Sequence, residues 1–240
     1  MPQVIPPAVP PDDPSLLTFP AAMLVGETLP CQRLSSTLRL HLTEHTYVPK
    51  VAVPRSDWVT TVALPAFQAY RTRYPERVEG GTVGVVGTGA GLDALAAIEI
   101  LAPARVVVTD VHQEVVSWAV HNIQANLRAP HTVQVEGLVG DLGEPFLARH
   151  VPCDVLYENL PNIPLPAGLD LLRSHHSAHF VHDTGEAVPP NVAEHLLGLH
   201  WRLLCQASLL LTATGHLLCA IGCRRPPRPL PSSGSCSPRL

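Results

Sequence analysis

The feature that most constrains the fold is a short β-branched run that leads directly into a cluster of glycines. Residues 83–86 read Val-Gly-Val-Val, and Gly87-Thr-Gly-Ala-Gly91 follows at once. An Ala-, Leu- and Ile-rich segment of helical character then continues to Leu101. A buried strand, a glycine turn and a helix in this order predict the start of a doubly wound α/β domain, because the glycines let the backbone turn sharply and approach a ligand.

The spacing of the glycines restricts the kind of ligand. A dinucleotide fingerprint, G-x-G-x-x-G, would need a glycine where Leu92 stands. The predicted strand 105–110 ends in Asp110, at the distance where a carboxylate accepts hydrogen bonds from two ribose hydroxyls. The G-x-G-x-G spacing resembles that of S-adenosylmethionine (SAM) methyltransferases, so the turn and Asp110 together predict a SAM site.

Strands and helices alternate through the rest of this half of the chain. We expect an amphipathic helix over 112–127, a long helix over 191–211, and strands over 132–136, 153–157 and 215–222. Crossovers of this length require a mainly parallel sheet, in which ligands bind at the carboxyl ends of the strands. Asp110, Asp141 and Asn159 follow such ends, which predicts that they share one site.

The domain boundaries follow from composition. Residues 1–15 read as a disordered Pro-rich arm, and the Pro- and Ser-rich residues 223–240 as a disordered tail. Residues 16–79 form a substrate or lid region, with a half-buried strand over 35–43 and a helix that begins at Ser56 or Asp57 and runs towards Tyr74. Residues 80–222 form the ligand-binding domain.

Charge and cysteine usage exclude several classes of protein. The chain has 240 residues, a net charge of −4 and a single lysine, Lys50, among its 16 basic residues, which disfavours a long nucleic acid as partner. Its six cysteines form no C-x-x-C pair, so reduced thiols in a cytoplasmic protein are expected. No secretory segment and no apolar run of membrane-spanning length are evident.

Taken in order, the motifs resemble those of class I SAM-dependent methyltransferases, which have a Rossmann-like fold. Within that superfamily the chain is most similar to the release-factor glutamine methyltransferases, which carry N-P-P-Y-I-P where this chain has Asn159-Leu-Pro-Asn-Ile-Pro164. Val53-Pro-Arg-Ser-Asp57 resembles their P-R-P-E-T-E segment, and Asp141-Leu142 resembles the start of their D-L-F segment. The similarity covers about residues 47–222.

The resemblance implies a role for each matched position. The glycines would pass under the methionine part of SAM, Asp110 would hold the ribose, and Asp141 with Leu142 would meet the adenine. Asn159 and the Leu160 carbonyl would accept hydrogen bonds from the NH₂ group to be methylated, and no metal is required. The implied cofactor-binding residues are Gly87, Thr88, Gly89, Gly91, Asp110, Val111, Asp141, Leu142 and Asn159. The implied catalytic residues are Asn159, Leu160 and Pro161.

Three positions depart from the family pattern. Val85 replaces an acidic residue that contacts the amino acid part of SAM, Leu160 replaces a proline, and Asn162 replaces the aromatic residue that stacks on a planar acceptor. The acceptor therefore stays open among a protein amide, a nucleobase and a small-molecule amine. The family also has two further strands after the fifth, and without them the apolar fifth strand would favour a homodimer.

We therefore predict a SAM-dependent N-methyltransferase that acts on a protein or small molecule. The alternatives are a non-catalytic or truncated SAM-binding protein and an NAD-dependent oxidoreductase, the latter disfavoured by Leu92. His175, His176, His179 and His182 have a spacing that would suit zinc on a helix, but a His-rich substrate loop is the favoured interpretation.

Overall fold

The computed structural model describes residues 15–25, 31–50, 57–77, 79–162 and 188–221. Three predicted segments lie outside these ranges: the arm except for its last residue, the histidine cluster at 175–182 and the tail at 223–240. The part of the P-R-P-E-T-E-like segment before Asp57 lies outside them as well.

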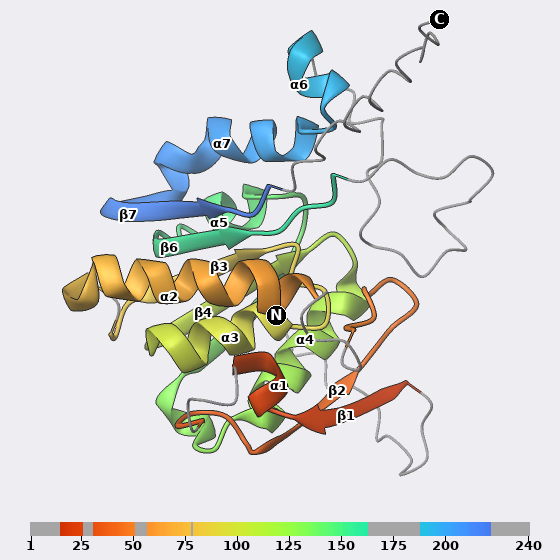
Figure 1. Ribbon diagram of the computed structural model, residues 1–240. Coiled ribbons are helices and arrows are strands. Elements are labelled where there is room, and N and C mark those ends of the chain that lie inside the picture. The colour runs from red at the N-terminus through yellow and green to blue at the C-terminus, as the bar shows by residue number, and fades with distance from the viewer. Residues whose placement is uncertain (1–14, 26–30, 51–56, 78, 163–187, 222–240) are drawn as a thin grey trace, which may run out of the picture.

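A five-stranded parallel sheet forms the centre of the molecule (Figure 1). Its strands are β3 (Thr82–Val86), β4 (Arg105–Asp110), β5 (Gln134–Val139), β6 (Cys153–Glu158) and β7 (Leu211–Cys219). They lie in the order β5-β4-β3-β6-β7, and every neighbouring pair is parallel. This order reverses direction at β3, so the predicted α/β class with a mainly parallel sheet is confirmed, and a crevice is expected beside β3.

Helices cover both faces of the sheet (Figure 1). One core contains side chains of α2 (Leu64–Arg73), α3 (Leu92–Leu101) and α4 (Gln113–Asn126); the other contains those of α5 (Glu144–Ala148) and α7 (Gly198–Leu210). Alternate residues of each strand supply the two cores: Val85 points into the first and Val86 into the second. This explains why the strands read as continuous runs of apolar residues.

The N-terminal region packs against the first helical layer. It contains β1 (Leu16–Pro20), α1 (Ala22–Val25) and β2 (Thr37–His41), and β1 pairs antiparallel with β2. The sequence did not indicate β1, because its residues lack a clear alternation. The helix expected from Asp57 is present, and the Asp57 carboxylate accepts a hydrogen bond from the Val59 amide at 2.9 Å. Its first part is a π-helix (Val59–Ala63), which continues into α2.

Two asparagines of α4 hold the free edge of β2. Asn126 exchanges both of its amide hydrogen bonds with the backbone of Arg39, at 2.8 and 2.7 Å. Asn122 does the same with His41, at 2.8 and 2.9 Å, and also donates to the Ala90 carbonyl at 3.0 Å. A side-chain amide presents the same donor and acceptor as a peptide group, so these two residues substitute for a third strand beside β1 and β2.

A buried carboxylate of α3 holds the segment that leads into β2. Glu99 is 7% exposed and accepts hydrogen bonds from the backbone amides of Gln32, Arg33 and Leu34, at 2.6, 2.9 and 3.0 Å. Three N–H donors compensate the cost of removing this charge from water. The N-terminal region is therefore fixed to the domain by buried polar bonds in addition to apolar contacts.

Several predicted boundaries are wrong. β5 begins two residues later than expected and runs to Val139, because 130–132 form a 3₁₀ turn. The helix expected over 191–211 is two helices, α6 (Pro190–Glu194) and α7, separated where Leu196 adopts a left-handed conformation with φ 58°. β7 starts at Leu211, four residues early, and as the edge strand of the described sheet it exposes Cys219, which the sequence placed in a buried strand.

Substitution of Asn122 tests the attachment of the N-terminal region. In Asn122→Ala, the buried polar groups of His41 and the Ala90 carbonyl lose their partner, so we expect the free energy of unfolding to fall by about 3 kcal/mol. Gln124→Ala, on the same helix but only half-buried, should cost about 0.5 kcal/mol or less. Urea denaturation of the two variants measures the difference, and equal stabilities would contradict this role for Asn122.

Candidate functional site

The glycine turn after β3 has the conformation that the sequence predicted. Gly87, Gly89 and Gly91 all adopt positive φ angles, of 70°, 50° and 89°. At Gly91 an added Cβ would lie 3.1 Å from Ile123 Cγ1 and 3.2 Å from the Ala119 carbonyl oxygen, so a side chain there would be crowded against α4 as well as strained by the positive φ. At Gly89 an added Cβ would meet nothing within 4 Å. The turn therefore packs tightly on one side and faces open space at Gly89.

Asp110 lies beside this turn, as the last residue of β4. Its carboxylate accepts hydrogen bonds from the amides of His112 at 3.2 Å and Gly89 at 3.4 Å. Burial raises the pKa of Asp110, and these two N–H groups oppose that shift. The two contacts fix the carboxylate at the rim of the glycine turn, where it can accept hydrogen bonds from a ligand.

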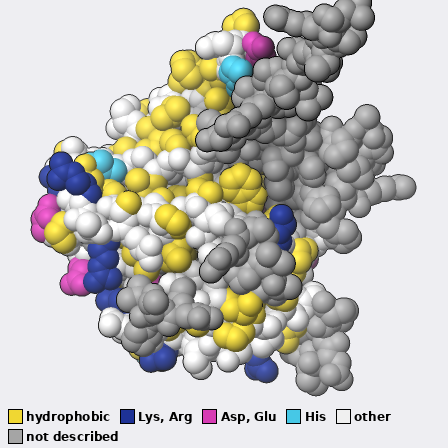
Figure 2. Space-filling model, viewed as in Figure 1, with side chains coloured by type: hydrophobic (Ala, Val, Ile, Leu, Met, Phe, Trp, Pro, Cys, Tyr) yellow, Lys and Arg dark blue, Asp and Glu magenta, His cyan; other side chains and the backbone are white. Residues whose placement is uncertain are grey.

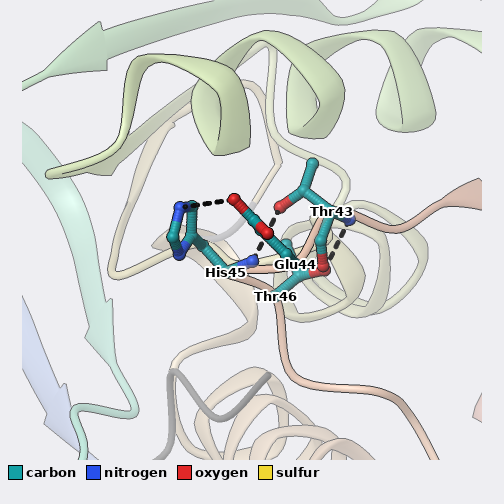
Figure 3. Close-up of polar contacts among 4 residues, drawn as sticks. All are labelled: Thr43, Glu44, His45 and Thr46. Atoms are coloured by element: carbon teal, nitrogen blue, oxygen red, sulfur yellow. Dashed lines mark hydrogen bonds and ion pairs between the residues drawn. The ribbon is translucent and has the colours of Figure 1, made fainter. Parts of the chain in front are cut away.

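A turn of the N-terminal region reaches the same end of the sheet. Figure 3 shows its residues, in which Thr46 Oγ1 accepts the Thr43 amide at 2.9 Å and donates to the Thr43 carbonyl at 2.9 Å. His45 in this turn stacks on His112, with ring centroids 4.3 Å apart and planes inclined by 8°. The region predicted as a lid thus contacts the loop that follows Asp110.

The residues expected at the adenine lie on the next loops. Val111 is 57% exposed, whereas Leu142 is buried and has a left-handed φ of 47°. Asp141 accepts a hydrogen bond from Arg202 of α7 at 2.6 Å. Their role at an adenine stays a prediction, and the contact with Arg202 shows that α7 helps to position Asp141.

The segment after β6 is held by a buried hydrogen bond between Glu158 and His200 that the sequence did not reveal. Glu158 is fully buried; one carboxylate oxygen lies 2.8 Å from His200 Nδ1, and the other accepts the Leu160 amide at 3.0 Å. Leu160 is buried, and Pro161 is half-buried. These contacts fix the backbone on both sides of Asn159, so the point from which its side chain extends is fixed at the carboxyl end of β6.

Asp93 is the second residue of this site that sequence analysis missed. It lies in the first turn of α3, is 8% exposed, and forms a hydrogen bond with the Asn159 side chain. Burial, and then the nearby charge of Asp57, raise its pKa to about 7 against the opposing effect of Asn159. The available signal was an acidic residue within the apolar run Leu92–Leu101.

Several buried polar atoms around the carboxyl ends of β3 and β6 have no hydrogen-bond partner among the described residues. They are Thr88 Oγ1, Asp93 Oδ1, Tyr157 Oη and His200 Nε2. Buried polar atoms are nearly always paired in folded proteins, so such a concentration marks a place where ligand groups or water complete the bonding.

A pocket opens between the N-terminal region and α3. It is a shallow pocket, and its lining is mostly apolar: Phe19, Met23, Leu24, Pro49, Lys50, Asp57, Thr60 and Leu92. Asp57 lines this pocket, and its charge raises the pKa of Asp93. The pocket therefore adjoins the Asp93–Asn159 pair. No helix in the described part of the chain is both long and apolar enough to cross a membrane.

Comparison with known proteins finds only distant similarity. No protein-family model matches the chain, and no curated protein matches it. The ribosomal protein L11 methylase of Lactobacillus delbrueckii subsp. bulgaricus is 18% identical with a TM-score of 0.38, over 65% of this chain and 56% of that one. TrmN of Thermus thermophilus is 20% identical with a TM-score of 0.41, over 68% and 37%. A SAM-dependent methyltransferase of Agrobacterium tumefaciens is 14% identical with a TM-score of 0.42, over 82% and 56%.

The chain thus spans less than two thirds of the length of each of these proteins. At such identities and TM-scores a shared activity does not follow from the likeness, so the function has to be argued from the residues of the site.

The raised pKa of Asp93 makes the stability of the protein depend on pH. The folded protein retains the Asp93 proton up to about pH 7, whereas the unfolded chain releases it near the usual aspartate pKa of 3.8. The folded state is therefore stabilised at low pH and loses this stability as the pH rises from about 4 to 7. Between pH 4 and pH 8 we expect the wild type to lose up to about 4 kcal/mol of its free energy of unfolding relative to Asp93→Asn, which has no carboxyl group to titrate at this position. Denaturant titrations across this range measure the difference, and a flat curve would contradict the assignment.

Proposed function

We propose that this chain is a SAM-dependent methyltransferase that acts on a nitrogen atom. The observation that carries the proposal is the convergence of three features at the carboxyl ends of the adjacent strands β4, β3 and β6. These are the Asp110 carboxylate, the left-handed glycine turn and the Asn159 side chain. A carboxylate beside a glycine turn, with a polar residue at the next strand, suits a nucleoside ligand that lies across the strand ends.

The residues fit SAM at the level of their chemistry. The open space at Gly89 leaves room for the chain of a ligand to pass against the backbone, and the Asp110 carboxylate is placed to accept hydrogen bonds from ribose hydroxyls. Val111 and Leu142 supply apolar surface on the neighbouring loops, which suits an adenine. The bound cofactor would supply an electrophilic methyl group on sulfur.

Asn159 is proposed to hold the acceptor nitrogen. Its carbonyl oxygen can accept an N–H of the substrate, which aims the nitrogen lone pair at the methyl group. Holding the two reacting groups in a near-attack geometry supplies much of the rate in such a transfer. The contacts of Glu158 with Leu160 and His200 keep this segment rigid, which reduces the cost of orienting the substrate.

The acceptor is proposed to be a protein or a small molecule. On the face shown in Figure 2, Lys and Arg side chains are scattered and form no continuous stripe, which gives a long nucleic acid little to bind. The placement within the release-factor glutamine branch rests on the Asn159-Leu-Pro-Asn162 motif and stays a prediction. A homodimer through the edge strand β7 also stays a prediction.

Substitution of Gly89 tests the cofactor site. Because an added Cβ at Gly89 meets no protein atom within 4 Å, Gly89→Ala should cost only the backbone strain of its φ of 50°, about 1 kcal/mol, yet its methyl group would occupy the ligand's space. Gly80→Ala is the matched control, since Gly80 has a φ of 78° and equally open surroundings at the amino end of β3. Calorimetric titration with SAM should show at least a ten-fold loss of affinity in Gly89→Ala only.

The same titration separates the two candidate cofactors. Binding of NAD in place of SAM by the wild type would identify an oxidoreductase and overturn the proposal. Equal SAM affinities in the two glycine variants would exclude the glycine turn as the site.

Substitution of Asn159 tests the acceptor site. Asn159→Ala should lower the rate of methyl transfer from labelled SAM to proteins and small molecules of a cell extract by at least ten-fold, with SAM affinity within about two-fold of the wild type. This pattern identifies a contact that matters mainly in the transition state. If the wild type binds SAM but transfers no methyl group, the alternative of a non-catalytic SAM-binding protein is correct.

A further inference from the structure

We infer that Asp93 accepts the proton of the methyl-accepting nitrogen, and that the acceptor is an amine that arrives as a cation. This inference rests on the proposed function, because it places the acceptor at Asn159. It is carried by a juxtaposition: a buried carboxyl group on α3 is bonded to the Asn159 side chain, while its other oxygen, Oδ1, has no partner among the described residues. Asp93 thus has one oxygen engaged by the proposed acceptor-binding residue and one available to a ligand.

The bond between Asp93 and Asn159 determines which end of the Asn159 amide faces the substrate. An ionised carboxylate can only accept hydrogen bonds, so it takes an N–H of Asn159. The Asn159 carbonyl oxygen is then the group left to accept an N–H of the substrate. Asp93 is therefore also a positioning residue for Asn159.

The charges around Asp93 favour a cationic substrate. The charge of Asp57, which precedes the π-helix, raises the pKa of Asp93, and Asp93 in turn raises the pKa of Tyr157 on β6. Asp57 contributes a second carboxylate and lines the pocket next to the site. A positive charge beside Asp93 would be stabilised by Asp93 and, at longer range, by Asp57, whereas an amide or a nucleobase brings no charge to them.

The proton transfer balances without a further reagent. The substrate R–NH₃⁺ gives one proton to the Asp93 carboxylate, which leaves R–NH₂ and a neutral carboxylic acid. The nitrogen lone pair forms the new N–CH₃ bond while the S–CH₃ bond of SAM breaks and its electron pair stays on sulfur, giving S-adenosylhomocysteine (SAH) and R–NH₂⁺–CH₃. Asp93 returns its proton to solvent after the product leaves, and a pKa of about 7 suits a group that both takes and releases a proton near neutral pH.

The SAM analogue sinefungin tests this assignment without the natural substrate. It carries a C–NH₃⁺ group where SAM carries the S-methyl group, so it presents a cation at the transfer position, whereas SAH presents nothing there. The ratio of the SAH to the sinefungin dissociation constant, measured by calorimetry between pH 5.5 and 8.5, isolates the effect of that cation. In the wild type we expect the ratio to rise at least ten-fold with pH as Asp93 ionises.

Three variants locate the effect. In Asp93→Asn the ratio should change less than two-fold over the same range. In Asp57→Asn the ratio of the dissociation constants should rise at a lower pH than in the wild type, because removal of a neighbouring carboxylate lowers the pKa of Asp93. Asp154→Asn is the matched control: Asp154 accepts the Thr82 amide at 2.8 Å at the opposite end of the sheet, so its ratio should follow the wild type.

The outcomes distinguish this inference from the proposed function. If the wild type binds neither SAH nor sinefungin, the proposed function fails and the inference falls with it. If both bind and Asp93→Asn keeps the pH-dependent ratio of the wild type, SAM binding stands and the role of Asp93 is wrong. Should Asp93→Asn fail to fold, Asp57→Asn decides, because an unmoved pH midpoint in that variant overturns the inference.

Discussion

The left-handed glycine turn between β3 and α3 is the constraint on which the surrounding structure depends. Because Gly91 has no Cβ, the turn can pack directly against Ile123 and the Ala119 carbonyl of α4. The same turn offers the Ala90 carbonyl to Asn122, which also binds the backbone of His41 in β2. A side chain at Gly91 would be strained by the φ of 89° and crowded against α4, the helix whose Asn122 also holds the N-terminal region.

Four carboxylates among the described residues are buried. Asp57 accepts hydrogen bonds from the Lys50 and Val59 amides, and the hydrogen bonding of the other three separates structural roles from a functional one. Glu99 is satisfied by three backbone amides, and Glu158 by His200 and the Leu160 amide. Asp93 has only the Asn159 side chain, and its Oδ1 has no partner among the described residues. A buried acid that is left incompletely bonded destabilises the fold unless a ligand completes it, and this sets Asp93 apart from the other two.

The sequence was sufficient for features that depend on local pattern. The strand, glycine turn and helix around Gly87–Gly91, the parallel sheet and the position of Asp110 at a strand end all follow from periodicity and glycine spacing. The helix break at Leu196 and the early start of β7 did not follow, because α7 and β7 join without a loop and no glycine or proline marks the junction at Leu211. The role of Glu158 was equally inaccessible, since its partner His200 is 42 residues away and meets it only in the folded chain.

The attachment of the N-terminal region bears on how a substrate would reach the site. A lid that opens on a hinge must break its contacts in each cycle, and here those contacts include the paired bonds of Asn122 and Asn126 and the three bonds to Glu99. Buried bonds of this kind are costly to leave unmade, so β2 and the segment before it behave as a fixed wall of the domain. Asp57, at the start of the π-helix, lines the apolar pocket, and Asp93 and Asn159 belong to the domain that this wall packs against. The charge of Asp57 raises the pKa of Asp93, so the two carboxylates repel each other while no cation is bound, and such repulsion is relieved when a cation binds beside them.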